Sequence, residues 1–250
     1  LLFNVPSERT AGLREIPLMG GVFEVLDEWR DLPVVGSYGR MLDPTNTTGR
    51  EKSGRVRVLI WQGVVDLITP HEPLEYPGGQ TDPFNWLRPL LGYGPESMYT
   101  AYNRFYPPEL ATVEARNASP DRSHNETFDT LVITGLMGLL AWQFLYLTVI
   151  HFAFSYLGVV RTRRDTWALV GLWIGGALLA TLVTVIVADP VYLGVAVPTG
   201  VILGVVVYLI YYALFSRGGI DGNGKGADPA RPFAADRLLM NALVASVLAH

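Results

Sequence analysis

Long stretches without a charged side chain fill the second half of this chain and limit what it can fold into. Residues 131–160 contain no Asp, Glu, Lys or Arg, and residues 167–188 and 191–215 repeat the pattern. About twenty helical residues are enough to cross roughly 30 Å of hydrocarbon. The fold class that these stretches predict is therefore an all-α polytopic membrane protein.

The apolar stretches divide the chain into six expected parts. Because the sequence opens on Leu1 and stops inside an apolar run, we expect a fragment whose last helix is truncated. Many prolines before the first apolar stretch indicate a loop domain with short helices. The expected parts are a loop domain at 1–126, spanning helices at 127–160, 166–188 and 191–215, a loop at 216–237, and the start of a fourth spanning helix at 238–250.

Basic residues indicate the orientation of these helices. Arg161, Arg163 and Arg164 lie between the first and second helices, and four Lys and Arg lie within 216–237. Loops rich in Lys and Arg remain on the cytoplasmic side of a membrane. We therefore expect a multi-pass plasma-membrane protein in which 216–237 is a mobile cytoplasmic loop and 1–126 is extracytoplasmic.

Composition and one glycine-rich loop exclude several classes of site. The chain has no cysteine, which rules out disulfides, thiolate zinc sites and cysteine nucleophiles, and its net charge of −4 argues against binding of nucleic acid. In 219–226, Gly226 follows Lys225 where a phosphate-binding loop needs Ser or Thr, and Pro232 stands where a calcium loop needs an acid. We expect no metal and no cofactor.

The loop domain contains several local signals. An apolar stretch at 57–68 predicts a helix that ends at Thr69-Pro70 and packs against apolar surface, and 70–85 reads as an irregular loop. The Gly92–Gly94 turn would place Pro95 at the first position of a second helix. Another short helix is expected after Pro107-Pro108.

A histidine lies directly before the first spanning helix. Asn125 is a plausible helix cap, with Asp129 in the first turn, so His124 would stand at the outer mouth of a membrane helix, where an anionic headgroup would bind. The alternative is that His124 is only a solvated loop residue. His151 lies 27 residues further on, about 40 Å along a helix, so we expect it, like Gln143, to make interhelical contacts instead.

Three separated segments, in this order, resemble the O-antigen ligase and polymerase family. They are Arg57–Trp61, then Pro89–Pro95, then His124-Asn125 followed by Gly135–Leu140. The resemblance covers about residues 50–150. It implies a metal-independent, inverting glycosyltransferase of the membrane C-type fold that uses a polyprenyl-diphosphate-linked glycan as donor.

The resemblance also assigns roles to residues. Arg57 matches the arginine expected to bind the donor diphosphate, and His124 matches the histidine expected to activate the acceptor. An arginine fork suits a diphosphate leaving group, and a histidine suits proton removal near neutral pH. Further substrate contacts are expected from Arg55, Trp61, Arg122 and Asn125, and Trp61, Gly92 and Gly94 match positions that look architectural.

Two departures from the family pattern leave questions open. The interval between Trp61 and Pro89 is long, and its insert at 70–88 either covers the site or binds an acceptor. Residues 126–129, after Asn125, are Glu-Thr-Phe-Asp, whereas the family has apolar or aromatic residues there.

The acceptor could be lipid-linked, glycan or protein. A non-catalytic membrane-anchored binding protein and a transporter remain alternatives, the latter weakened by the uncharged spans.

Overall fold

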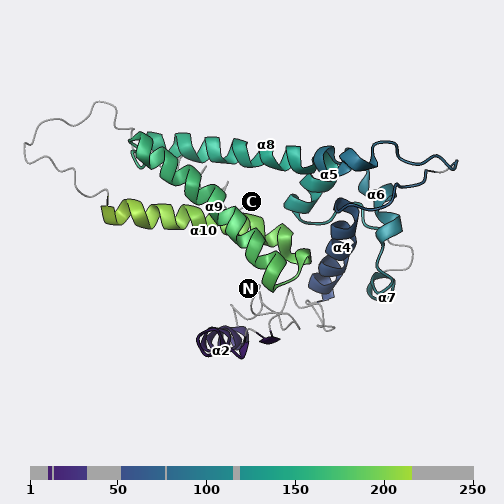
Figure 1. The fold of residues 1–250 in the computed structure, drawn as a ribbon, viewed down its shortest axis with the longest axis horizontal. Coiled ribbons are helices and arrows are strands. Elements are labelled where there is room, and N and C mark those ends of the chain that lie inside the picture. Colours follow the sequence, from purple (N-terminus) through teal and green to yellow (C-terminus); the bar gives the residue numbers. More distant parts are fainter. Residues whose placement is uncertain (1–10, 13, 33–51, 77, 115–118, 216–250) are drawn as a thin grey trace, which may run out of the picture. The chain divides into compact units, whose positions relative to one another are not determined.

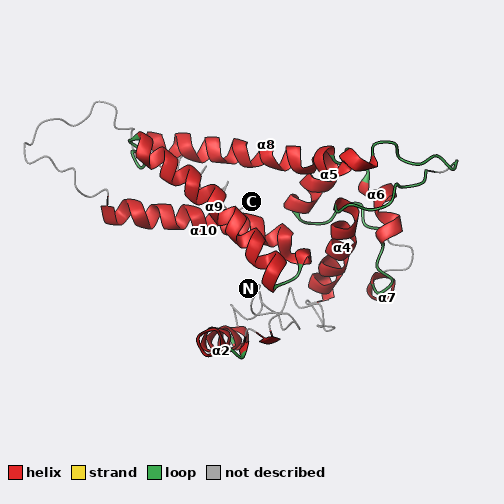
Figure 2. Cartoon of the chain, in the orientation of Figure 1, coloured by secondary structure: helices red, strands yellow, loops and turns green. Residues whose placement is uncertain are grey.

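The structure is a computed structural model that describes residues 11–12, 14–32, 52–76, 78–114 and 119–215. Within these ranges it is helical and contains no β-strand, although an isolated antiparallel bridge joins Glu75 and Thr81. Figure 1 labels the helices along the chain, and Figure 2 shows the loops that connect them. The predicted loop at 216–237 and the predicted fourth helix at 238–250 lie outside the described residues.

Three helices are long and apolar enough to cross a membrane, which confirms that prediction. They are α8 (Glu126–Tyr156), α9 (Arg163–Val187) and α10 (Leu193–Phe215), the last preceded by the short helix η5 (Pro190–Tyr192). Helix α8 ends at Tyr156, earlier than the predicted 160. The reason is Gly158, whose φ of 70° allows its N–H to bond Ser155 O while the next N–H bonds Phe154 O, a common way to terminate a helix.

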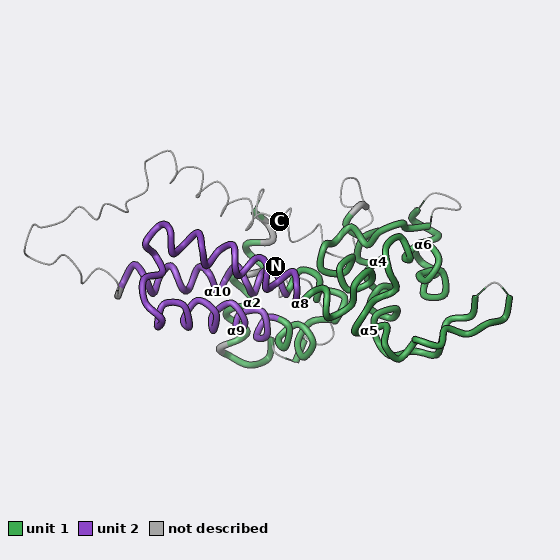
Figure 3. Tube along the Cα trace, turned by 90° about the horizontal axis from the view of Figure 1, so that it is seen from above, with its two compact units in different colours: residues 1–139, 181–196 green, residues 140–180, 197–250 purple. Residues whose placement is uncertain are grey.

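The chain divides into two compact units, shown in Figure 3, which are described separately. Unit 1 comprises residues 1–139 and 181–196, and unit 2 comprises 140–180 and 197–250. In unit 2 the backbones of Gly176 in α9 and Gly200 in α10 touch, so a β-carbon on either residue would collide with the other helix. The core of unit 2 is built from the buried side chains of Ile150, Phe154, Val160, Leu169, Trp173, Val201, Val205 and Tyr208.

Polar side chains also connect the helices of unit 2. Trp173 Nε1 donates to Gln143 Oε1 at 3.1 Å, and His151 Nε2 lies 3.1 Å from Thr166 Oγ1. Both pairs join α8 to α9. The prediction that Gln143 and His151 make interhelical contacts is therefore confirmed.

Unit 1 is organised around α4 (Lys52–Ile68), which contains the helix predicted at 57–68 and begins earlier. It ends as expected, where Thr69 bonds back to Val65 O and Pro70 follows. The side chains of α4 are buried on several sides: Val58, Leu59, Ile60, Trp61, Val64 and Leu67 are each at most 3% exposed. The helix is therefore the centre of the unit 1 core.

Several short helices lie in 85–113, and those from 98 to 113 contribute buried side chains to the same core as α4. The short helices are η3 (Asn85–Leu87), α5 (Arg88–Leu91), α6 (Met98–Ala101), η4 (Tyr102–Phe105) and α7 (Leu110–Val113). The prediction that Pro95 begins a helix is wrong, because α6 starts at Met98. Glu96 has a φ of 56° and Gly94 a φ of 99°, which make a turn incompatible with a helix in this place. Unit 1 also contains α2 (Pro17–Asp31).

Candidate functional site

Ser123 anchors the turn that precedes α8. Its carbonyl accepts a hydrogen bond from Trp61 Nε1 at 2.9 Å, and its side chain is fully buried. The Ser123 backbone N–H and hydroxyl both donate to Asp129 Oδ1, at 2.8 and 2.7 Å. The turn is therefore tied to α4 on one side and to the first turn of α8 on the other.

Asn125 fixes the other end of the same turn. Its Oδ1 accepts from the backbone N–H of Phe128 at 3.1 Å, which confirms the predicted helix cap. Its Nδ2 donates to Gly194 O at 3.1 Å, so the side-chain amide is engaged at both ends. Asn125 thus joins the start of α8 to the start of α10, both within unit 1.

His124 lies between these two anchors in a left-handed conformation. Its φ is 56°, a region that non-glycine residues rarely occupy, although histidine tolerates it better than most. Such conformations persist where the surroundings fix them, and here Ser123 and Asn125 do so. The His124 side chain itself is exposed. The result is an accessible imidazole on a rigid turn.

The other two histidines that the structure describes are engaged. His71 Nδ1 lies 2.6 Å from Glu72 O, and His71 Nε2 lies 2.7 Å from Tyr93 Oη. His151 Nε2 contacts Thr166. Among described residues the His124 imidazole alone makes no hydrogen bond within the chain. It is the histidine best placed to exchange a proton with a bound molecule.

The arginines expected at the site occupy different positions. Arg57 is exposed and lies four residues before Trp61, one turn earlier on α4. Arg122 is exposed next to Ser123. Arg55 is two residues from Arg57, about 200° around the helix, so the two do not share a face. Arg55 is half-buried and its Nε makes no hydrogen bond.

Trp61 is buried rather than open to a ligand. It is 3% exposed, its nitrogen is bonded to Ser123 O, and its ring centroid lies 6.0 Å from that of Phe128. In this position the indole supports the turn that presents His124. The architectural role suggested for Trp61 agrees with this geometry.

Helix α8 is broken at Gly135, which was not predicted. Gly135 has φ 65° and ψ −165°, a conformation available almost only to glycine. The carbonyls of Val132 and Ile133 accept instead from the backbone N–H groups of Tyr93 and Gly94, at 2.7 and 2.9 Å. A helix can break within an apolar segment when neighbouring backbone satisfies its hydrogen bonds in this way.

The break requires two glycines in contact. A β-carbon on Gly135 would collide with the backbone of Leu90 and Gly92, and one on Gly92 would collide with Ile133 and Thr134. Hydrogen bonds therefore connect the neighbourhoods of the three segments within unit 1. Trp61 of the first bonds to Ser123, directly before His124. Tyr93 and Gly94 of the second bond to the α8 backbone just before Gly135. Tyr93 Oη also donates to Leu67 O at 3.2 Å, joining the second segment to α4.

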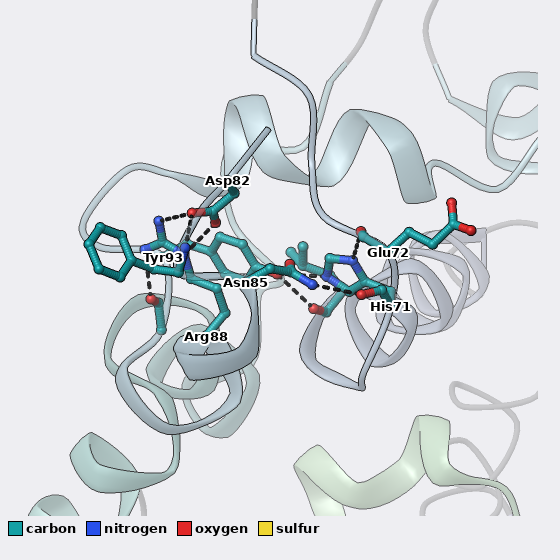
Figure 4. A network of polar contacts seen from close by, with 9 residues as sticks. His71, Glu72, Asp82, Asn85, Arg88 and Tyr93 are labelled. Atoms are coloured by element: carbon teal, nitrogen blue, oxygen red, sulfur yellow. Dashed lines mark hydrogen bonds and ion pairs between the residues drawn. The ribbon is translucent and has the colours of Figure 1, made fainter. Parts of the chain in front are cut away.

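The insert at 70–88 is closed by its own polar network (Figure 4). Asp82 is 2% exposed and pairs with Arg88 through contacts of 2.7 and 3.1 Å. Hydrogen bonds from Arg88 hold the pKa of Asp82 below its usual value. Arg88 also donates to Gly92 O and lies over the Tyr93 ring, whose burial raises the pKa of Tyr93 to about 12. At neutral pH both Arg88 and Tyr93 therefore keep their protons.

Sequence reasoning missed the supports of the site. Ser123 and Asp129 were not singled out as partners, although a Ser two residues before a helix cap and an Asp in the first turn are a recognisable local pattern. The Asp82–Arg88 pair had no such signal.

Comparison with protein-family models, with curated proteins and with solved structures finds no match to this chain.

Proposed function

We propose that this chain is the catalytic part of a membrane glycosyltransferase that moves a glycan from a polyprenyl diphosphate to an acceptor hydroxyl. The observation that carries the proposal is His124, an accessible imidazole held in a left-handed turn by Ser123 and Asn125. Conformational strain of this kind gathers at functional sites. The resemblance of the three segments to the O-antigen ligase and polymerase family supports the same activity.

His124 serves as the general base. The acceptor O–H gives its proton to the imidazole while its oxygen bonds to the anomeric carbon of the donor sugar. The bond from that carbon to the diphosphate oxygen breaks, and its electron pair leaves with the polyprenyl diphosphate. Attack from the opposite face inverts the configuration at the carbon. The imidazolium then releases its proton to water.

Arg57 binds the departing diphosphate. Its guanidinium fork suits two phosphate oxygens, and among described residues it makes no ion pair that would compete. Arg122, beside the turn, adds a second cation, whereas Arg55 lies on another side of α4 and is not assigned to the diphosphate. Trp61 and Asn125 hold the turn in place and so act through His124.

The proposed activity includes a location. Residues 1–126 lie on the extracytoplasmic side of the plasma membrane, and the basic residues between α8 and α9 lie in the cytoplasm. The broken end of α8 then lies near the outer surface, where a lipid-linked donor presents its diphosphate. The acceptor is a hydroxyl on a lipid, glycan or protein.

The test is glycan transfer by the complete protein in membranes. We expect His124→Ala to lower the rate by about a hundred- to ten-thousandfold, as is usual when a general base is removed, while the protein still binds donor. Added imidazole should restore part of the lost rate, because the site is accessible. The matched control is His151→Ala, which should transfer at close to the normal rate. Normal transfer by His124→Ala would exclude it as the base.

Arg57 is tested by a change that keeps its charge. We expect Arg57→Lys to lower the rate by roughly a hundredfold, since lysine loses the two-pronged contact. Arg163→Lys, on an exposed arginine at the start of α9, is the control and should have no effect. Equal rates for Arg57→Lys and wild type would remove Arg57 from the site.

A further inference from the structure

A large hollow lies beside the insert at 70–88. Its volume is about 1050 Å³, and it is bounded by the insert on one side and by α6 and η4 on the other. Ligand sites for small molecules usually measure about 300–1,000 Å³, so the hollow has room for a molecule of several rings. All its walls belong to unit 1. It is not part of the His124 turn.

The walls offer hydrogen-bond acceptors. The hydroxyl of Ser97 donates to Gly94 O at 2.6 Å, and that of Thr100 donates to Ser97 O at 3.1 Å. With their protons engaged, these oxygens are left to accept from a ligand. Glu72 and Glu75 add carboxylates, which only accept. A ligand that fits must therefore supply many O–H or N–H donors.

The two cations of the hollow are already neutralised. Arg88 is bonded to Asp82 and to Gly92 O. Arg104 is paired with Glu72 at 3.1 Å and also donates to Pro73 O at 3.0 Å. A phosphate or uronate would find no unengaged guanidinium among these walls and would face the carboxylates. The hollow therefore disfavours anions.

Aromatic rings complete the site. Tyr76 is 45% exposed and Tyr93 lies under the Arg88 guanidinium at 5.2 Å. A tyrosine presents an apolar face together with a polar edge, which matches the C–H face and the hydroxyl rim of a sugar ring. Both rings belong to the wall that the insert forms with the Tyr93 segment.

Hydrogen bonds and an ion pair hold the insert wall together without a ligand (Figure 4). Asn85 Nδ2 donates to His71 O at 2.6 Å, and His71 in turn contacts Tyr93 Oη. The buried Asp82–Arg88 pair closes the other end. A preformed wall reduces the entropy lost on binding.

We propose that this hollow binds an uncharged oligosaccharide. Its acceptor-rich walls match the hydroxyls of a glycan, its carboxylates and paired arginines disfavour anionic sugars, and the exposed ring of Tyr76 provides a stacking face. The inference rests on the proposed function only for the biological source of this oligosaccharide, which is the glycan of either the donor or the acceptor. Binding itself does not depend on that function.

The first experiment measures binding to the complete protein in lipid nanodiscs. The probes are uncharged gluco-, galacto- and manno-tetrasaccharides, each compared with a counterpart that carries a uronic acid. We expect at least one uncharged probe to bind, and its uronate counterpart to bind at least tenfold more weakly. Absence of binding across the uncharged panel, or tighter binding of the uronates, would overturn the proposal.

Variants locate the binding in the hollow. We expect Tyr76→Ala and Thr100→Leu, both on exposed side chains, each to weaken binding about tenfold. The matched control is Tyr99→Ala, an exposed tyrosine of α6 that does not line the hollow and should bind normally. Equal affinity of Tyr76→Ala, Thr100→Leu and wild type would show that the glycan binds elsewhere.

Two further measurements separate this inference from the proposed function and identify the source of the glycan. His124→Ala should bind the tetrasaccharide normally while it fails to transfer. If the wild-type protein binds the tetrasaccharide in the hollow but never transfers glycan, the binding proposal is supported and the proposed function is excluded. If it transfers glycan but binds no tetrasaccharide in the hollow, the binding proposal is excluded and the proposed function is supported. In the transfer assay, Tyr76→Ala should raise KM for only one substrate, and that substrate carries the bound glycan.

Discussion

Glycine brings backbones together in both units of this protein, with opposite consequences. In unit 1, Gly92 and Gly135 both have positive φ, and their contact accompanies the break in α8. In unit 2, Gly176 and Gly200 stay helical, and α9 and α10 continue through the contact. The Gly92–Gly135 pair accompanies a change in the direction of the chain, whereas the Gly176–Gly200 pair packs two unbroken helices.

The difference shows what a broken helix requires. At Gly135 the carbonyls released from α8 are satisfied by Tyr93 and Gly94, so the break is inseparable from the 89–95 segment. At Gly176 nothing is released, because the helix keeps its own hydrogen bonds. Irregular backbone therefore occurs in unit 1, which also contains the His124 turn, while the α9–α10 contact of unit 2 joins regular helices.

Substitution of Gly135 should have the largest effect. A β-carbon there is disfavoured both by the backbone conformation and by collision with Leu90, so we expect Gly135→Ala to cost about 4 kcal/mol of unfolding free energy. Unfolding by denaturant in mild detergent measures this. Gly171→Ala is the control, since a β-carbon there meets nothing within 4 Å. Equal stability of the two variants would mean that the break is not needed.

Gly200→Ala should be less costly. Its helical conformation accepts alanine, so the whole penalty comes from separating α10 from Gly176, and we expect about 2 kcal/mol. The same denaturant titration applies, again with Gly171→Ala beside it. A Gly200→Ala loss larger than that of Gly135→Ala would reverse the comparison between the two units.

Acid should weaken unit 1 through Asp82. Its pKa lies below the usual 3.8 in the folded protein, so its ionised form contributes stability at higher pH, and that contribution is lost as the pH falls below about 4 through the lowered pKa. We expect Asp82→Asn to cost about 2 kcal/mol at pH 7, and less in acid. Stability curves of the two proteins against pH should converge on acidification; parallel curves would contradict the assignment.

The smallest effect is expected at Gln143 in unit 2. Gln143→Leu removes the hydrogen bond from Trp173, and such bonds between membrane helices average about 0.6 kcal/mol. A Trp173→Phe variant and the double variant complete a thermodynamic cycle. A coupling energy near zero would mean that the pair adds packing alone.

Much of the helical framework follows from local sequence. Uncharged length predicts α8, α9 and α10, Thr69-Pro70 predicts the end of α4, and Asn125 predicts the cap of α8. These features depend on neighbouring residues only. The break at Gly135 does not, because in sequence Gly135 resembles Gly171 or Gly175, and only contact with a distant segment distinguishes it.

The candidate site rests partly on local and partly on long-range features. His124 could be selected because it stands next to a cap, yet its left-handed backbone depends on Trp61, which is far away in sequence. The Asp82–Arg88 pair and the hollow depend on how the insert folds back on α6 and η4. Long-range contacts of this kind leave no periodic signal in one sequence.

A change in the length of the insert at 70–88 should cost little free energy. The insert leaves α4 after Ile68 and returns at α5, and the Asp82–Arg88 pair closes it near its return. For a flexible loop, doubling the length costs only about 0.6 kcal/mol in closure entropy. A longer or shorter insert could therefore reshape the hollow while the hydrogen bonds that hold His124, which all lie outside it, stay unchanged. The shape of the hollow and the geometry of the His124 turn can thus vary independently.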